Sequence, residues 1–331
     1  MSNAPYNPPL LLRNGHIQTF LASSSLRARG ADEMQASART EILATDAGVN
    51  LLGFRSRQIG SRPKGLAVLL HGWEGSSDST YIRRTGRSLY QRGYEIFRLN
   101  LRDHGPSHHL NSGLFFAAWL DEVFEAFRRV SQEPNKLPVF LVGFSLGANF
   151  ALRIALRCRN LPIPNLRHVV AISPVLDPEE STRRADRHPV IRRYFMKKWR
   201  RSLMLKQRLF PHLYNFRPIM RCRTIHQATD LILERYSEFP SSKAYFDAYT
   251  LTGTRLKDLP VPATLLTSAD DPIIPVQDFH GLQLNPSTTL VIHRHGGHNG
   301  FLEGPGLRSR YENDLPSLFD RWTHAAHSTP P

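Results

Sequence analysis

Residues 138–147 read Pro138-Val139-Phe140-Leu141-Val142-Gly143-Phe144-Ser145-Leu146-Gly147, an apolar run that leads directly into a serine flanked by glycines. The run has the composition of a buried strand, and the residues that follow it have the spacing of a helix. A G-x-S-x-G pattern between a strand and a helix is typical of a nucleophile elbow, a turn so tight that the flanking positions exclude a Cβ. We therefore expect Ser145 to project above a sheet, beside the free N–H of Leu146 at the start of the helix.

Short apolar runs alternate with helical patterns on both sides of this turn, which predicts a mostly parallel sheet with helices on both faces. Two more runs, 40–44 and 49–55, flank a turn-like Asp46-Ala47-Gly48 and predict an antiparallel hairpin. About eight strands result. The expected parallel strands are 65–70, 94–99, 138–142, 168–172, 264–267 and 288–292.

About 90 residues separate the expected strands 168–172 and 264–267, far more than a strand-to-helix connection normally holds. We expect this insertion, 174–255, to form a helical cap over Ser145, because it leaves and re-enters the sheet on the side where the serine is exposed. The remaining chain then divides into an N-terminal segment, 1–39, that packs on the core, and the core itself, 40–173 and 256–331.

The chain is strongly basic. Its 331 residues hold 43 Lys and Arg against 28 Asp and Glu, and 40% of them are hydrophobic, which excludes a disordered tail. Residues 183–208 alone contain eleven Lys or Arg and one acid, with an apolar residue at every fourth position from Ile191 through Phe195 and Trp199 to Leu203. This pattern predicts a basic amphipathic helix. Its apolar side could line a substrate pocket or pack in the cap, and its charged side could contact an anionic membrane or only solvent.

Other features argue against secretion and against cofactors. Two cysteines, Cys158 and Cys222, cannot form a disulfide framework, and no early apolar run is long enough for a signal sequence, so we expect a cytoplasmic protein, which the basic helix could also bring to a membrane surface. No stretch approaches the roughly 20 apolar residues of a spanning helix. No phosphate-binding glycine loop follows a strand, and the histidines of 102–109 match no zinc spacing, so neither a cofactor nor a metal is expected.

A serine nucleophile needs a histidine base that is oriented by a carboxylate. Asp270 and Asp271 follow the expected strand 264–267, and three histidines follow the strand 288–292, so the chain order is serine, acid, histidine. His298 is favoured as the base over His293 and His295 because the preceding glycine pair, 296–297, lets the loop reach Ser145. Either aspartate could orient it.

The loop after strand 65–70 reads His71-Gly72-Trp73-Glu74-Gly75 and should supply a second oxyanion donor, the N–H of Trp73. Trp73 could also wall a substrate pocket, and the ring of His71 could hold the loop in shape through bonds to its backbone. The candidate substrate contacts are His71, Phe144 and Trp199.

Several of these motifs together resemble the YheT-like branch of the α/β-hydrolases, which is related to the α/β-hydrolase-domain lipases and to yeast alcohol acyltransferases. The resemblance covers nearly the whole chain and rests on the blocks 7–9, 12–19, 71–75, 143–149, 270–272 and 295–301. It implies an α/β-hydrolase fold, with Ser145 as nucleophile, Asp271 as acid and His298 as base. Many relatives have an Arg-Gly-Cys-like loop where this chain has Arg102-Asp103-His104-Gly105, so substrate preference does not carry over.

The resemblance and the residue order together predict a serine hydrolase that cleaves carboxylic esters, either short- or medium-chain acyl esters or acylglycerols, through an acyl-enzyme. An acyltransferase that passes the acyl group to an alcohol, or a phospholipase, would use the same residues. A non-catalytic basic module that binds membrane or nucleic acid is the alternative of another class. We expect a small ester or lipid as the partner and no nucleic acid.

Overall fold

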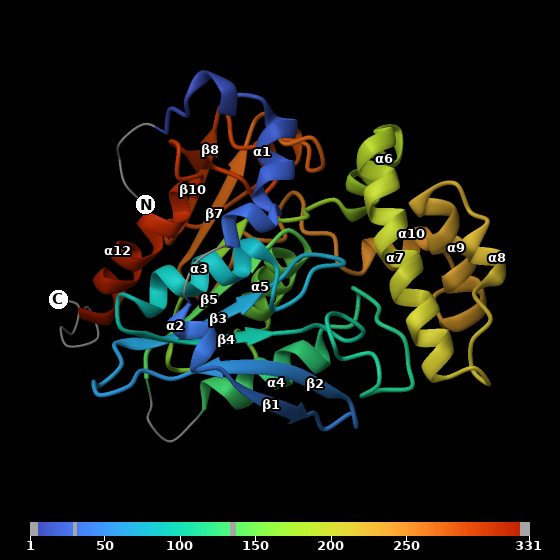
Figure 1. Ribbon diagram of the computed structural model, residues 1–331, viewed down its shortest axis with the longest axis horizontal. Coiled ribbons are helices and arrows are strands. Elements are labelled where there is room, and N and C mark those ends of the chain that lie inside the picture. Colours follow the sequence, from blue (N-terminus) through green and yellow to red (C-terminus); the bar gives the residue numbers. More distant parts are fainter. Residues whose placement is uncertain (1–5, 29–31, 133–136, 325–331) are drawn as a thin grey trace.

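The computed structural model of the chain describes residues 6–28, 32–132 and 137–324, arranged around one large sheet (Figure 1). The sheet has eight strands in the order β1-β2-β4-β3-β5-β6-β7-β8. β2 runs antiparallel to both neighbours and all the other adjacent pairs are parallel, which confirms the predicted sheet. The strands are β1 (Arg39–Ala44), β2 (Asn50–Ser56), β3 (Gly65–Leu70), β4 (Tyr94–Leu99), β5 (Val139–Phe144), β6 (Leu166–Ile172), β7 (Ala263–Ser268) and β8 (Thr288–His293).

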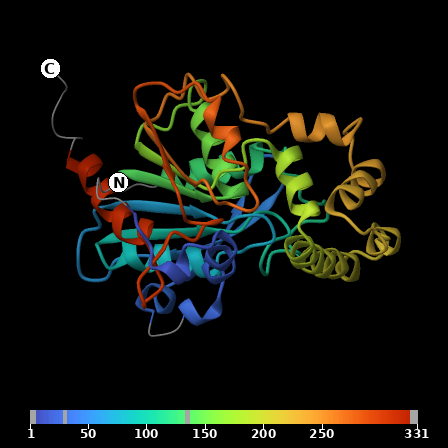
Figure 2. The same ribbon diagram turned by 90° about the horizontal axis from the view of Figure 1, so that it is seen from above.

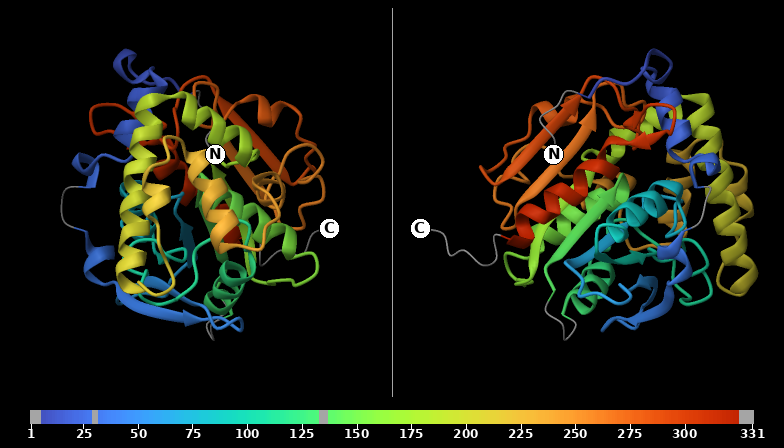
Figure 3. Two further views of the ribbon diagram at one scale, coloured as in Figure 1. Left: turned by 90° about the vertical axis from the view of Figure 1, so that its right-hand side faces the viewer. Right: turned by 60° about the vertical axis from the view of Figure 1, so that its left-hand side comes forward.

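Helices cover both faces of the sheet, which explains why β3, β4, β5 and β7 are buried along their whole length. One face packs against α4 (Asp121–Ser131) and α5 (Leu146–Arg157), and the other against α3 (Thr80–Tyr90) and α12 (Arg310–His324) (Figure 3). The smaller elements are η1 (Leu10–Leu12), α1 (Gly15–Ala22), η2 (Ser25–Ala28), α2 (Glu33–Ala36), α11 (Gln277–His280), β9 (Leu302–Glu303) and β10 (Arg308–Ser309).

The predicted hairpin at the start of the sheet is confirmed. β1 pairs with β2 in antiparallel register from Arg39 opposite Arg55 to Ala44 opposite Asn50. Gly48 in the connecting turn has a φ of 74°, a conformation that glycine adopts without the steric cost of a Cβ.

Five helices lie between β6 and β7 and gather on one side of the molecule, away from the sheet (Figures 1 and 2). We call them the inserted helices: α6 (Pro178–Arg187), α7 (Pro189–Leu209), α8 (Arg217–Met220), α9 (Ile225–Tyr236) and α10 (Ser242–Asp247). α7 is the longest of them at 21 residues. Within the residues described, no helix combines the length and the apolar character needed to cross a membrane.

The composition of residues 183–208 predicted one basic helix, but the structure has two helices in this segment. α6 ends at Arg187 and α7 begins at Pro189, with the His188 side chain accepting from the N–H of Ile191 as an N-cap. Proline lacks a backbone N–H and clashes with the preceding turn inside a helix, whereas it fits the first helical position. The continuous apolar and basic pattern therefore belongs to α7 alone, whereas Arg183 and Arg187 of α6 form ion pairs with Glu179 and Glu180 of the same helix.

Candidate active site

Ser145 occupies the turn between β5 and α5. It has φ 56° and ψ −117°, a backbone conformation that residues with a side chain rarely adopt. A Cβ added to Gly143 would lie 2.2 Å from the carbonyl oxygen of Gly147, and one added to Gly147 would lie 2.4 Å from that of His71. The two glycines therefore allow β5, α5 and the loop after β3 to meet at the serine.

His298 is held by Asp271. The Nδ1 of His298 lies 2.9 Å from Oδ2 of Asp271, and the aspartate side chain is fully buried. The other oxygen, Oδ1, accepts from the N–H groups of Ile273 and Ile274 at 2.8 and 2.9 Å, which fixes the carboxylate in the turn after β7. An ionised carboxylate only accepts, so Nδ1 carries the proton and Nε2 of His298 is left free to accept one.

The neighbouring Asp270 has different partners. Its Oδ1 accepts from the N–H of Gly297 at 2.9 Å, and its Oδ2 lies 3.6 Å from Nδ1 of His295. The sequence allowed either aspartate to orient the histidine. In the structure, Asp271 contacts the ring of His298, and Asp270 accepts from the backbone of the loop that carries His298. His293 is the last residue of β8, so the strand extends one residue beyond the expected 288–292.

The N-terminal segment braces the histidine loop. The hydroxyl oxygen of Thr19 accepts from the N–H of His298 at 2.9 Å and donates to the carbonyl of Gly15 at 2.6 Å. The buried side chain of Gln18 accepts from the N–H of Leu302 at 2.7 Å. No sequence pattern relates residue 19 to residue 298, and sequence reasoning missed this support.

The loop after β3 lies against the serine. A Cβ added to Gly72 would come within 3.0 Å of Cβ of Ser145, so the next residue, Trp73, begins beside the nucleophile. Among the described residues, the backbone N–H of Trp73 and that of Leu146 find no hydrogen-bond acceptor. Two unpaired donors next to a serine are what an oxyanion hole requires.

Comparisons with known proteins agree with the observed fold and with the position of Ser145 in the turn between β5 and α5. A model of the alpha/beta hydrolase family matches residues 67–308. The chain belongs to the alpha/beta hydrolase family. This match includes Ser145, Asp271 and His298, which the fold brings to the same region.

The relatives of this alpha/beta hydrolase span most of its length. An abhydrolase domain-containing protein of Dictyostelium discoideum is 25% identical over 310 residues, which cover 90% of this chain and 76% of the relative. "Putative esterase YheT" of Escherichia coli is 22% identical over 264 residues, 78% of this chain and 77% of the relative, which supports the resemblance to that branch.

Solved structures show the same fold. The Pyrococcus furiosus esterase Pf2001 has a TM-score of 0.55 at 15% identity and covers 96% of this chain and 100% of its own. A 2,6-dihydroxy-pseudo-oxynicotine hydrolase has a TM-score of 0.59 at 15% identity, with coverage of 90% and 73%. At such identities the likeness concerns the fold alone.

Two cavities of the hydrolase meet at Ser145. The first, the apolar cavity, has a volume of about 150 Å³ and lies between α5 and the inserted helices. The second, the histidine-side cavity, has a volume of about 390 Å³ and includes His298 and Thr19 in its lining. Ser145, Trp73, Phe195 and Ile273 line both.

The apolar side of α7 contributes to these walls. Phe195, Trp199 and Leu203 line the apolar cavity, and Ile191 lines the histidine-side cavity. Trp73 stacks on Phe195 with ring centroids 5.2 Å apart and meets Trp199 edge-on at 5.1 Å. The sequence left two roles open for this stripe, and both are observed: Ile191 and Leu203 belong to the buried hydrophobic core, Phe195 and Trp199 pack against it, and all four also line a cavity.

His71 and Phe144 do not lie where substrate contacts were expected. His71 is fully buried, donates from Nδ1 to the carbonyl of Gly72 at 2.8 Å and accepts at Nε2 from the N–H of Leu101 at 3.1 Å. Burial lowers the pKa of His71 to about 4, so the ring is neutral and holds the loop. Phe144 points to the opposite face of the sheet, against Tyr81 and Tyr311, because successive side chains of a strand alternate. Neither residue lines the two cavities, and His71 has the other role that the sequence allowed, which is to hold the loop through bonds to its backbone.

Proposed function

We propose that the protein is a carboxylic ester hydrolase that acts through an acyl-enzyme on Ser145. The observation that carries the proposal is what surrounds the Ser145 hydroxyl. The neighbouring N–H groups of Trp73 and Leu146 have no acceptor within the described part of the chain, and His298, which Asp271 orients, lines a cavity together with Ser145. "Putative esterase" names among relatives from Escherichia coli and a Synechocystis species are in line with this chemistry.

In the first half-reaction, Nε2 of His298 takes the proton of Ser145 as Oγ attacks the ester carbonyl. The N–H groups of Trp73 and Leu146 donate to the oxyanion that forms. Collapse of this intermediate breaks the ester bond, and His298 returns the proton to the departing alcohol. A water molecule then loses a proton to His298 as it attacks the acyl-serine, and His298 returns this proton to Oγ of Ser145 as the acid leaves, which restores the serine.

The two cavities suggest where each part of the ester lies. The acyl chain fits the apolar cavity, since its walls are mostly hydrophobic side chains. The alcohol and the attacking water must reach His298, so they belong in the histidine-side cavity. We propose that the inserted helices act as a cap that closes the acyl side, with short- or medium-chain esters and acylglycerols as substrates.

The larger cavity next to His298 also favours a second candidate activity, acyl transfer to an alcohol. An alcohol bound there in place of water would lose its proton to the same histidine and yield a new ester. Phospholipase activity would follow the same steps on a phospholipid ester. Product analysis with added ethanol separates transfer from hydrolysis, because only transfer gives ethyl esters at a rate that rises with ethanol.

The decisive experiment replaces the nucleophile. Ser145→Ala should lower kcat roughly 10⁶-fold on a panel of p-nitrophenyl esters and monoacylglycerols, and should abolish labelling by a fluorophosphonate. Ser131→Ala is the matched control, because it removes a buried hydroxyl that bonds within α4 and lines neither cavity. Labelling that persists in Ser145→Ala would refute the assignment.

We also propose that the outer side of α7 contacts an anionic lipid surface. α7 has six basic residues between positions 192 and 201, and three of them, Arg192, Lys198 and Arg200, bond to backbone carbonyls of the protein. The other three are exposed and lie on the same side as four exposed apolar residues. The exposed cations are Arg193, Lys197 and Arg201, and the apolar residues are Val190, Tyr194, Leu205 and Leu209. Exposed cations interleaved with apolar side chains are typical of helices that lie on a membrane.

A further inference from the structure

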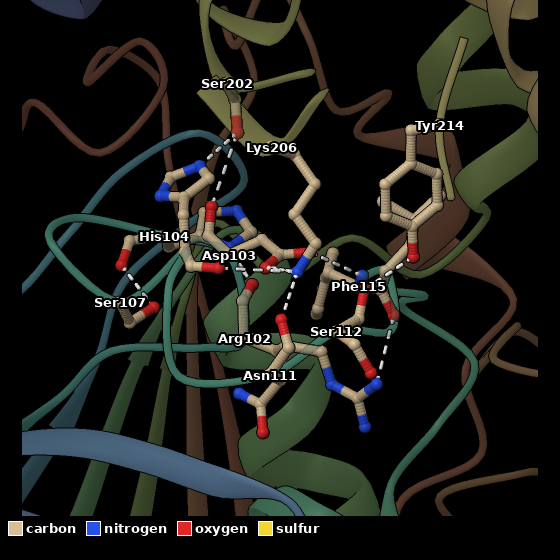
Figure 4. Close-up of polar contacts among 12 residues, drawn as sticks. Arg102, Asp103, His104, Ser107, Asn111, Ser112, Phe115, Ser202, Lys206 and Tyr214 are labelled. Atoms are coloured by element: carbon tan, nitrogen blue, oxygen red, sulfur yellow. Dashed lines mark hydrogen bonds and ion pairs between the residues drawn. The ribbon is translucent and has the colours of Figure 1, made fainter. Parts of the chain in front are cut away.

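One side of the apolar cavity is polar. Its charged lining residues are Glu74, Asp103 and Lys206, which come from the loops after β3 and β4 and from α7. Figure 4 shows Asp103 and Lys206 gathered with His104 and Ser202 around the loop after β4. Since the remaining walls are mostly hydrophobic, the few polar groups decide which polar atoms a bound acyl group can carry.

Asp103 and Lys206 have their partners within the protein. Nζ of Lys206 lies 2.7 Å from Oδ1 of Asp103 and donates to the carbonyl of Asn111 at 2.7 Å (Figure 4). The second oxygen of Asp103 accepts from the N–H of Phe115 at 3.1 Å. This buried pair fastens α7 to the loop after β4, and because its two charges compensate each other, the pair does not select an ionic substrate.

Most other polar side chains of this lining are bonded within the protein or covered by it. Nε2 of His104 and Oγ of Ser181 have no partner in the described part of the chain, but both atoms are buried, so a ligand in the cavity does not reach them. The side chains that form hydrogen bonds within the protein are Thr182, Ser202, Thr229, Tyr245 and Tyr249.

The carboxyl of Glu74 differs from all of these groups. No described residue forms a hydrogen bond or an ion pair with it, and its oxygens are not shut off as Nε2 of His104 is. The nearby Lys198 donates instead to the backbone carbonyl of Glu74, at 3.0 Å, and lines the histidine-side cavity. Apart from the Ser145 hydroxyl, the Glu74 carboxyl is therefore the polar group that a ligand in the apolar cavity can reach and bind, among the residues described.

The surroundings of Glu74 lack a positive charge that could balance it. Burial raises the pKa of Glu74 to about 8; the charge of Lys198 opposes this rise and that of Asp103 adds to it. Lys206 is already paired with Asp103, and burial keeps His104 neutral by lowering its pKa well below the usual value. A cation bound in the cavity would supply the missing charge and allow Glu74 to ionise.

The cavity is complementary to a single positive charge. With Glu74 ionised, its lining carries two carboxylates against the one ammonium of Lys206. Much of the remaining wall is aromatic, and the face of an aromatic ring attracts a cation. The rings nearest in the chain to the polar groups are Trp73, Phe115, Phe116, Phe195 and Trp199. An ammonium group can use both the carboxylate and the rings, whereas a neutral polar group can use only the first.

We propose that Glu74 binds an ammonium group on the acyl part of the substrate, so that the preferred substrates are esters of acids that carry a free amine. The ammonium donates hydrogen bonds to the carboxylate, and hydrogen bonds between two charged groups are the strong ones. A plain acyl chain leaves this carboxyl without a partner, and an anionic chain would place like charges together. This inference rests on the ester hydrolysis proposed above.

The test compares ethyl esters in pairs that differ only at the end of the acyl chain, which is either an ammonium or a methyl group. The amino acids are glycine, β-alanine and ω-aminohexanoic acid, and their methyl-ended partners are propanoic, butanoic and heptanoic acid. An ammonium also changes the intrinsic reactivity of an ester, so the ratio of kcat/KM within each pair is compared between protein variants. For at least one chain length, this ratio should fall roughly 10-fold or more in Glu74→Gln, which keeps the size of the side chain and removes its charge.

Asp78→Asn is the matched control. Asp78 belongs to the same loop after β3, but its carboxylate pairs with Arg98 and lines only the histidine-side cavity. The ratio should therefore stay within a factor of about two of the wild-type value in this variant. Glu74→Asp keeps the charge on a shorter side chain and should retain part of the preference.

If Glu74→Gln does not fold, calorimetry of the wild type decides. Binding of a straight-chain alkylammonium ion at pH 7 should release about one proton, because the cation favours the ionised form of a carboxyl whose pKa is about 8 in the empty cavity. The release is measured from binding heats in buffers of different ionisation enthalpy. An alcohol of equal length should release none.

Equal ratios in the wild type and Glu74→Gln, an equal loss of preference in Asp78→Asn, or alkylammonium binding without proton release overturns the inference and leaves ester hydrolysis standing. Failure to cleave any ester in a reaction that depends on Ser145 overturns both.

Discussion

Replacing Asp271 by asparagine tests how the carboxylate controls the histidine. Oδ1 of Asp271 accepts from two backbone N–H groups, so an asparagine there must keep its oxygen at that position. Its NH₂ group then faces Nδ1 of His298, where Oδ2 lies 2.9 Å away in the wild type. Because an NH₂ group donates and cannot accept a hydrogen bond, Nδ1 must become the acceptor, so the ring proton moves to Nε2, which can then no longer act as a base.

If the asparagine were rotated, its NH₂ group would face the N–H groups of Ile273 and Ile274, and hydrogen-bond donors would face donors in a fully buried turn. Rotation of the side chain therefore does not restore the active tautomer of His298. We therefore expect kcat to fall roughly 10⁴-fold, equivalent to about 5 kcal/mol of transition-state stabilisation, with little change in the fold. Steady-state hydrolysis of a p-nitrophenyl ester measures the loss, and thermal unfolding checks that the variant is folded.

Asp270→Asn is the control. Asparagine can still accept from the N–H of Gly297, and the contact with His295 is long at 3.6 Å, so kcat should stay within a factor of about three. If Asp270→Asn loses turnover and Asp271→Asn keeps more than about a tenth of it, the role given to Asp271 is wrong.

Two further predictions concern the hydrogen bond between Thr19 and His298 and the basic surface of α7. Thr19→Val removes the acceptor of the His298 N–H and should lower kcat about 10-fold, whereas Thr19→Ser should restore it; equal rates in all three proteins would show that Thr19 does not position the histidine. Replacing three exposed cations by Gln should weaken sedimentation with phosphatidylserine vesicles roughly 100-fold at low salt, at about 1 kcal/mol for each charge, and salt-insensitive binding equal to that of the wild type would remove the membrane role. The cations are Arg193, Lys197 and Arg201.

The sequence alone determined the parts of this protein that depend on local sterics and periodicity. The elbow at Ser145 follows from two glycines whose Cβ atoms would collide with backbone, and β3 and β4 begin and end where the apolar runs do. The order of serine, acid and histidine along the chain was likewise readable. The break between α6 and α7 at Pro189 is a local feature that the sequence analysis missed. The basic residues continue across this proline, and their pattern was interpreted as a single helix.

Tertiary structure decided what depends on contacts between distant segments. Asp270 and Asp271 are adjacent in the sequence, and only the turn after β7 shows which of them reaches His298. Thr19 meets His298 across 279 positions, a contact that no local pattern encodes. Both nitrogens of the His71 ring are bonded to the backbone, whereas Nε2 of His104 has no hydrogen-bond partner among the described residues. No sequence pattern shows this difference, because hydrogen-bond partners depend on how loops pack rather than on residue type.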